Sequence, residues 1–180
     1  MAAVTTTTAA ADTTTKTVLI TGGNRGLGKA LVECFAAKPD WNVLATARNI
    51  ESLLPADNNN NGTTTSNIND RYALDLSKHD QVVSLAKILI KENHTIDLII
   101  HNAGFNPKDQ KSIDGYFEST FYCNEQFSAT NVAESMMINA LHPMELTGKL
   151  LPILHKDAVV IAVSSWLGSI GAKVRFLTFG

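Results

Sequence analysis

The sequence predicts an α/β domain with a doubly wound parallel sheet. Short apolar stretches that suit strands alternate along the chain with segments in which apolar residues recur at helical spacing. The expected strands are apolar on both faces, which is typical of a parallel sheet covered by helices on both sides. This alternation indicates the doubly wound class, and right-handed crossovers then determine most of the topology.

Length and composition exclude several classes of protein. A chain of 180 residues suits one domain and buries roughly 70% of its unfolded surface. Its formal net charge of −2 offers no basic excess for nucleic acid, and no apolar run reaches the length of a membrane span. Cys34 and Cys123 cannot form a disulfide framework, and no secretory signal is visible. We therefore expect a cytoplasmic protein without nucleic-acid or membrane partners.

The first elements follow an Ala/Thr-rich tail, residues 1–16, which has no apolar periodicity and is interpreted as disordered. A transit peptide is the alternative, although the tail has no arginine. Residues 17–20 predict a short buried strand, and residues 41–46 predict the second strand. Between them, a helix ending before Pro39 is predicted from apolar residues at helical spacing, namely Leu27, Ala30, Leu31, Cys34 and Phe35.

The middle of the chain begins with an Asn/Thr-rich stretch, residues 57–67, which is too polar to pack and predicts an inserted surface loop. A short strand over 72–75 comes next. Ser77 and Asp80 resemble a capping box that opens the following helix. One face of this helix carries four apolar residues, Val82, Leu85, Ala86 and Leu89.

The last elements are a strand over 96–100, a long helical segment over 132–154 and an apolar strand over 158–163. Pro143 and Pro152 predict local breaks within the helical segment. Together these elements predict one doubly wound α/β domain over the part of the chain that follows the tail, residues 17–180.

A glycine-rich turn, Thr-Gly-Gly-Asn-Arg-Gly-Leu-Gly over 21–28, joins the first strand to the first helix. Gly22, Gly26 and Gly28 suit a tight turn, a close approach of backbone to a pyrophosphate, and close packing of helix on strand. The helix N-terminus carries about half a positive charge and favours phosphates. An ordinary glycine-rich turn is the alternative interpretation, but the flanking strand and helix favour nucleotide binding.

The end of the second strand indicates which nucleotide is bound. A carboxylate about 20 residues past the glycines would bind the ribose hydroxyls of NAD, but this chain has Arg48 there. Arginine suits a 2′-phosphate, and Arg25 adds a second positive charge nearby. Glu51 is interpreted as solvated. The pattern favours NADP(H) as cofactor, with ordinary surface arginines as the alternative.

Five motifs in one order resemble those of the short-chain dehydrogenase/reductase family, and most of all its C-factor-like and carbonyl-reductase-like members. They are the glycine turn, Asp75-Leu76, Asn102-Ala103-Gly104, Asn139 within Met-Ile-Asn-Ala, and Ser165 within Val-Ser-Ser. The resemblance covers residues 17–171 and implies a Rossmann fold. It also implies NADP(H)-dependent hydride transfer to or from a small-molecule carbonyl or alcohol, and a possible homo-oligomer.

The resemblance also implies roles for individual residues. Asn139 and Ser165 would be catalytic, with Ser164 as the competing serine, and no residue is expected to bind metal. Asp75 would bind the adenine amino group, with the Leu76 amide beside it. His101 stands where the family usually has asparagine, and it is interpreted as tolerated variation with a satisfied hydrogen bond. The expected cofactor-binding residues are Gly22, Asn24, Arg25, Gly26, Leu27, Gly28, Arg48, Asp75, Leu76, Asn102, Ala103 and Gly104.

The family's acid/base pair, a tyrosine followed four positions later by lysine, does not occur in these 180 residues. Tyr72, Tyr116 and Tyr122 are followed at that spacing by leucine, threonine and glutamine. A positioned acid contributes roughly 10²–10⁴ in rate, so the chain alone is expected to have little activity.

Because this tyrosine and lysine pair does not occur, we also expect the fold to be incomplete at its C-terminal side. The helix that carries the pair and the last strands are expected to be absent, which leaves the fifth strand at an edge with uncovered apolar faces. A non-enzymatic NADP-binding protein that pairs with a full-length relative is the alternative function. Substrate-wall candidates in the loop over 105–130 are Tyr116, Phe117, Phe121 and Tyr122.

Overall fold

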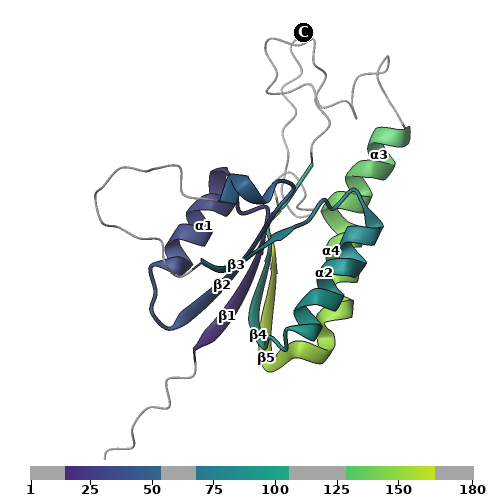
Figure 1. Cartoon of the computed structure of the whole chain (residues 1–180). Helices are drawn as coiled ribbons and strands as arrows, with labels where there is room; N and C mark the ends of the chain where they lie inside the picture. Colours follow the sequence, from purple (N-terminus) through teal and green to yellow (C-terminus); the bar gives the residue numbers. More distant parts are fainter. Residues whose placement is uncertain (1–14, 54–67, 106–128, 165–180) are drawn as a thin grey trace, which may run out of the picture.

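The described part of the computed structural model comprises residues 15–53, 68–105 and 129–164 (Figure 1). It contains one parallel sheet of five strands in the order β3-β2-β1-β4-β5. Both directions of winding start from the central strand β1, as predicted for a doubly wound sheet. The strands are β1 (Lys16–Thr21), β2 (Trp41–Ala47), β3 (Ile68–Ala73), β4 (Ile96–His101) and β5 (Leu154–Ala162).

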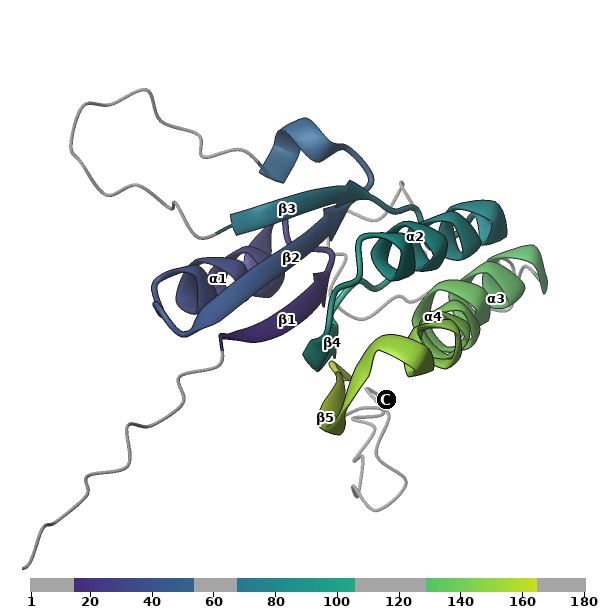
Figure 2. The same cartoon turned by 60° about the horizontal axis from the view of Figure 1, so that its bottom comes forward.

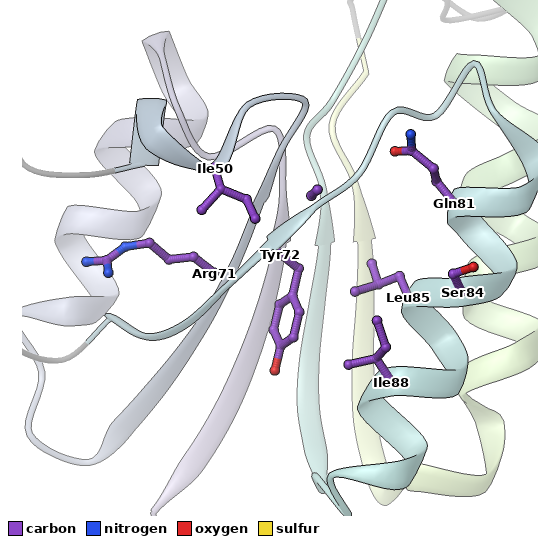
Figure 3. A pocket seen from close by; sticks show the side chains of 8 residues that line it. Ile50, Arg71, Tyr72, Gln81, Ser84, Leu85 and Ile88 are labelled. Atoms are coloured by element: carbon purple, nitrogen blue, oxygen red, sulfur yellow. The ribbon is translucent and has the colours of Figure 1, made fainter.

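Helices cover both faces of the sheet (Figure 2). α1 (Gly26–Ala36) lies on one face, and α2 (His79–Lys91), α3 (Ala129–Met136) and α4 (His142–Leu150) lie on the other. A π-helical segment, η2 (Met137–Leu141), joins α3 to α4 without interruption. The edge strand β3 runs between α2 and the short 3₁₀ helix η1 (Ile50–Leu53), as Figure 3 shows. A second 3₁₀ turn, η3 (Leu151–Ile153), leads into β5.

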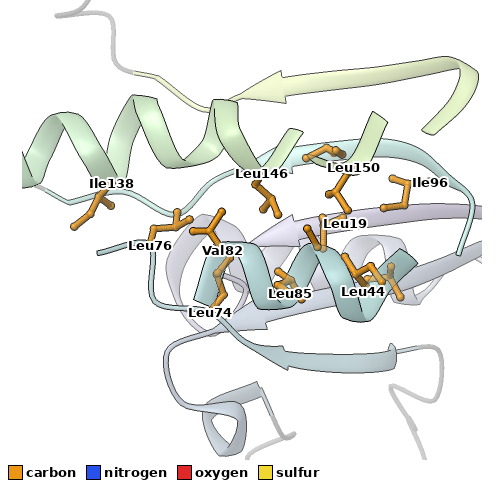
Figure 4. Close-up of a cluster of buried hydrophobic side chains, with 13 residues drawn as sticks. Leu19, Leu44, Leu74, Leu76, Val82, Leu85, Ile96, Ile138, Leu146 and Leu150 are labelled. Carbon is orange, nitrogen blue, oxygen red and sulfur yellow. The ribbon is translucent and has the colours of Figure 1, made fainter. Parts of the chain in front are cut away.

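Two hydrophobic clusters fill the spaces between the sheet and its helices. Successive residues of β1 point to opposite faces, so Leu19 enters one cluster while Val18 and Ile20 enter the other. The larger cluster packs the sheet against α2 and α4, with Leu85 and Leu146 at its centre (Figure 4). Burial on both faces explains why the central strands are continuous apolar runs.

The helix predicted before Pro39 is confirmed as α1, but the apolar residues that predict it do not all face the sheet. Leu27 is 57% exposed, and Ala30 and Cys34 are also exposed, while Gly28, Val32 and Ala36 are buried. The close approach of Gly28 to the preceding turn sets the rotation of the helix, because a Cβ at Gly28 would lie 2.1 Å from the carbonyl oxygen of Gly22. Leu31 and Phe35 are partly buried beside this face.

The predicted capping box of α2 is also wrong. The helix begins at His79, and no side chain caps it. The Ser77 hydroxyl instead donates to Asp75 Oδ1 at 2.8 Å, because β3 ends at Ala73 and leaves Asp75 in a turn. The predicted inner face is confirmed, since the four predicted apolar residues are all buried.

The segments at the C-terminal side differ from prediction in their bounds. Helical structure ends at residue 153, and β5 begins four residues earlier than expected. The expectation of uncovered apolar faces on this strand is confirmed: Val159 is 54% exposed, and Val160 and Ile161, which point to opposite faces, are both 44% exposed. No helix within the described ranges is long and apolar enough to cross a membrane.

Several predictions concern parts of the chain outside the described residues. These are the tail except for its last two residues, the Asn/Thr-rich loop over 57–67, the aromatic wall candidates and Cys123. The last residue of the predicted tail, Lys16, is the first residue of β1.

Candidate functional site

The glycine turn lies between the end of β1 and the start of α1. Gly22 and Gly26 have φ values of +71° and +53°, a region that L side chains rarely adopt. A Cβ at Gly22 would lie 2.9 Å from the Cα of Ala103, so glycine is also required there by close packing. A Cβ at Gly26 would meet nothing within 4 Å. Gly26 thus opens onto free space where a ligand can approach the backbone.

No side-chain cap is present at the N-terminus of α1 within the residues that the structure describes. Arg25 occupies the N-cap position, but its side chain makes no capping hydrogen bond. The first turn also contains no acidic residue. Unsatisfied amides and the helix dipole favour an anion at this position. The prediction that this turn carries phosphate groups therefore has a suitable geometry.

Asn102 holds the turn from the neighbouring strand. Its side-chain nitrogen donates to the backbone oxygens of Thr21 and Gly22, at 3.2 and 3.1 Å. The Thr21 hydroxyl in turn accepts from the backbone amides of Asn102 and Ala103, both at 3.1 Å. The Asn102 side chain therefore fixes the glycine turn, while Gly104 after it is exposed.

Asp75 and Leu76 form the next turn along the same edge of the sheet. Asp75 Oδ1 accepts hydrogen bonds from the backbone amide and the hydroxyl of Ser77, at 3.0 and 2.8 Å. Burial opposes ionisation of this carboxyl, but the Ser77 hydrogen bonds and the nearby charges of Lys78 and Arg48 outweigh it and lower the pKa of Asp75. Asp75 is thus an ionised acceptor.

The remaining predicted cofactor residues surround this edge. Arg25 and Arg48 are exposed, and the charge of Arg48 reaches Asp75. Asn24 is half-buried in the glycine turn, whereas Leu27 is exposed on the first turn of α1. Glu51 is exposed, in agreement with its interpretation as solvated.

Asn139 lies in the π-helical segment η2. Its side chain is exposed and pairs with the backbone of one residue, Phe105. Oδ1 accepts from the Phe105 amide at 2.7 Å, and Nδ2 donates to the Phe105 oxygen at 2.8 Å. The extra residue of a π turn re-aims a side chain, so the distortion and the pairing belong together. Asn139 thus ties η2 to the segment after β4.

Ser165, the other predicted catalytic residue, lies outside the described residues. Ser164 is described, exposed, and follows β5 at the carboxyl edge that also bears the glycine turn. In open α/β sheets, ligands bind outside the carboxyl ends of the strands. The described residues therefore gather the turns after β1, β2, β3 and β4 along the edge where a dinucleotide would lie.

A family model for short chain dehydrogenases matches residues 16–176 of the chain. The chain belongs to the short chain dehydrogenase family. It is 30% identical to the short chain dehydrogenase gsfK of Penicillium aethiopicum over 172 residues, which are 89% of this chain and 61% of that protein. It is 29% identical to the L-fucose dehydrogenase of Bos taurus over 162 residues, 87% of this chain and 51% of that one.

Solved structures of family members share the fold. A putative short-chain dehydrogenase/reductase from Burkholderia multivorans with bound NADP is 25% identical, with a TM-score of 0.65, and the match covers 89% of this chain and 63% of that one. The putative carbonyl reductase Sniffer of Caenorhabditis elegans is 25% identical with a TM-score of 0.63, over 86% of this chain and 65% of that one. The chain spans 61%, 57% and 51% of three curated relatives that it matches.

His101 departs from the usual family residue and is only half satisfied. Nε2 lies 2.8 Å from the Thr147 hydroxyl, which itself donates to the Pro143 oxygen, so the network assigns the proton to Nε2. Nδ1 is buried without a hydrogen-bond partner within the described structure. Burial lowers the pKa of His101 to about 4, so the ring is neutral near pH 7. This agrees with the interpretation of His101 as something other than a catalytic base.

A separate hollow of about 300 Å³ lies beside the edge strand β3 rather than at the glycine turn (Figure 3). None of the predicted site residues lines it. Gln81 connects it to the site, because its Oε1 accepts from the Asp75 amide at 2.8 Å. Its lining residues are Ile50, Arg71, Tyr72, Ala73, Gln81, Ser84, Leu85 and Ile88.

Sequence reasoning missed two side chains that build the site, His142 and Thr147, and it included Thr21 in the glycine turn without assigning it a role. Each bonds to a residue far away in the sequence, for example His142 to the backbone oxygen of Leu76, 66 residues apart. Thr21 stands at the end of the first predicted strand, and its place beside the glycines is the only sequence signal that could have pointed to it.

Proposed function

We propose that the chain binds NADP(H) across its glycine turn and is the cofactor-binding part of an oxidoreductase for small-molecule carbonyls or alcohols. The observation that carries this proposal is the uncapped N-terminus of α1 behind Gly26, which opens onto free space. An anionic pyrophosphate suits this position better than any side chain present there. A related structure from Burkholderia multivorans with bound NADP supports the choice of ligand.

The described residues fit a dinucleotide from end to end. The amides of Gly26, Leu27 and Gly28 would hold the pyrophosphate, and Asp75 would accept from the adenine amino group through Oδ2, since Oδ1 is taken by Ser77. Arg48 would pair with a 2′-phosphate, and Arg25 would share this role. Asn102, Ala103 and Gly104 support the turn from β4. When bound, the cofactor supplies or accepts the hydride.

The proton chemistry is assigned by resemblance and remains a proposal. Asn139 would act through its place in η2, and Ser165 would bind the substrate oxygen. The 180 residues contain no tyrosine followed four positions later by lysine. We expect this chain, taken by itself, to bind NADPH but to turn over carbonyl substrates slowly, because a positioned acid is worth about 10²–10⁴ in rate.

A second candidate is a non-enzymatic NADP-binding protein that pairs with a longer relative. The uncovered apolar side chains of β5, at 44–54% exposure for Val159, Val160 and Ile161, favour such pairing. The candidates differ in one measurement. Reduction of a small aldehyde by NADPH, followed by the absorbance of the reduced nicotinamide, would show slow turnover in the first and none in the second.

Cofactor preference is tested by fluorescence titration of the chain with NADPH and with NADH. Arg48→Ala should weaken NADPH binding about tenfold or more, because a charge-assisted hydrogen bond is worth about 1.5–3 kcal/mol, and should leave NADH binding unchanged. Lys87→Ala removes an exposed cation on α2 and is the matched control. Equal binding of NADPH and NADH by the unmodified chain would contradict the preference, and binding of neither would contradict the site.

A further inference from the structure

His142, the first residue of α4, forms a buried tie to the turn after β3. Its Nδ1 lies 2.5 Å from the backbone oxygen of Leu76. His142 is 2% exposed and Leu76 is 4% exposed, so water does not compete for this contact. The hydrogen bond joins a helix on one face of the sheet to the loop that precedes α2.

The chemistry of the two groups fixes the direction of the bond. A backbone carbonyl oxygen only accepts, so Nδ1 carries the proton and Nε2 carries the lone pair. Nε2 is buried and has no hydrogen-bond partner in the part of the chain that the structure describes. A buried polar atom without a partner destabilises the fold. An apolar side chain would avoid this cost, so the contribution of His142 lies in what it holds in place.

What His142 holds is the backbone that carries Asp75 and Leu76. The Asp75 amide is bound by Gln81 from α2, and the Leu76 oxygen is bound by His142 from α4. The turn is therefore fixed by one polar side chain from each helix. Asn139, one turn earlier than His142, fixes Phe105 in the same way. One continuous helical stretch thus sets the positions of two segments of the proposed cofactor edge.

We propose that His142 is a positioning residue for the adenine half of the cofactor. It holds the Leu76 backbone in the position from which the Asp75 carboxylate can accept a hydrogen bond from the adenine amino group. This inference rests on the proposed function, because it assumes that the Asp75-Leu76 turn receives the adenine.

The experiment compares four variants with the unmodified chain, two at His142, one at His79 and one at Leu150. His142→Leu keeps bulk and removes the donor, whereas His142→Asn retains a donor nitrogen at the distance of Nδ1 from the backbone. His79→Gln is the matched control: His79 lies beside His142, with ring centroids 5.8 Å apart, but it bonds to Glu145 at 2.8 Å and not to the turn. The probe is adenosine 2′,5′-bisphosphate, which represents the adenine half alone, titrated by calorimetry.

The proposal expects affinity for this probe to fall about three- to tenfold in His142→Leu, which is the worth of one neutral hydrogen bond. The Asn variant should recover to within about twofold of the unmodified chain, and His79→Gln should not change. Hydrogen exchange of the backbone amides of Leu76 and Ser77, measured without ligand, should quicken only in His142→Leu. Thermal unfolding of Leu150→Val, which loosens α4 without touching the turn, separates general destabilisation from positioning.

Unchanged probe affinity and unchanged exchange in His142→Leu would overturn the proposal, and so would an equal loss of affinity in Leu150→Val. Failure of the unmodified chain to bind either the probe or NADPH would overturn the proposed function instead. The exchange measurement still tests the tie in that case, because it needs no cofactor.

Discussion

Asn102, which follows β4, donates two hydrogen bonds to Thr21 at the end of β1. The Thr21 hydroxyl accepts from the Asn102 amide at 3.1 Å, and the Asn102 side chain donates to the Thr21 oxygen at 3.2 Å. Thr21 is fully buried and Asn102 is half-buried, so both hydrogen bonds are partly shielded from water. Asn102 at the end of β4 therefore holds the glycine turn that follows Thr21 in shape before any ligand binds. This preorganisation lowers the entropic cost of binding.

Replacement of Thr21 tests this lock. Thr21→Val keeps the shape but removes the acceptor of two backbone amides, so the free energy of unfolding should fall by about 1–3 kcal/mol. Thr21→Ser keeps the hydroxyl, so its free energy of unfolding should fall by less than that of Thr21→Val. Urea unfolding followed by circular dichroism measures both. If the valine variant were as stable as the serine variant, the hydroxyl would not be the group that holds β4.

A methyl group at two glycines should have opposite effects. Gly28→Ala places a Cβ 2.1 Å from the Gly22 oxygen and should destabilise the chain by about 1–3 kcal/mol, because the turn must move. Gly148→Ala lies in α4 with nothing within 4 Å of the new Cβ, and it should stabilise by about 0.5–1 kcal/mol. Thermal unfolding compares them. A neutral Gly28→Ala would mean that helix and turn are packed less closely than described.

Asn139 should control the segment after β4. In Asn139→Ala the Phe105 amide loses its acceptor at 2.7 Å, and its hydrogen exchange should quicken by about threefold or more, the worth of a weak hydrogen bond. Asn139→Asp still accepts from this amide but cannot donate to the Phe105 oxygen, so it should protect the amide in part. Mass spectrometry of a peptide that contains residues 102–105 reads the rate. Identical exchange in all three chains would contradict the tie.

His101 should make stability depend on pH. Its pKa is about 4 in the folded chain and 6.5 in the unfolded chain, so the unfolded state binds more protons between these values. The contribution of the neutral His101 ring to the free energy of unfolding is fully present above pH 6.5. It is lost as the pH falls toward 4, and the total loss is about 3 kcal/mol.

The matched variant for this pH dependence is His101→Gln, which cannot titrate and carries a donor nitrogen at about the distance of Nε2, the atom that faces Thr147. The free energy of unfolding of the unmodified chain, minus that of the variant, should fall between pH 7 and pH 4.5. A difference that stays constant over this range would show that His101 is not held neutral.

The order of elements could be predicted from the sequence because each rests on local pattern. Strands such as residues 17–20 are apolar runs bounded by turn residues, and α2 displays a clear apolar face. The inner face of α1 could not be predicted in this way. Gly28 has no side chain to count toward a pattern, yet its approach to the Gly22 oxygen decides which side of the helix faces the sheet.

The candidate site was predictable only where one residue type is chemically necessary. Gly22 and Gly26 were identifiable because few residues tolerate their backbone angles. The roles of Thr21, Thr147 and His142 were not identifiable, since each acts through a partner that the fold brings near from a distant part of the chain. Ser77 was misassigned because its local options, a helix cap or a bond to Asp75, differ only in where β3 ends.

The central claim, that the glycine turn and the Asp75-Leu76 turn receive NADP(H), is tested most directly by nuclear magnetic resonance of the ¹⁵N-labelled chain during titration with NADPH. The largest changes in amide shift should fall on Gly26, Leu27, Gly28 and Leu76, with small changes at the hollow beside β3, reported by Ser84 and Ile88. Changes centred on the hollow, or no changes at saturating NADPH, would contradict the claim.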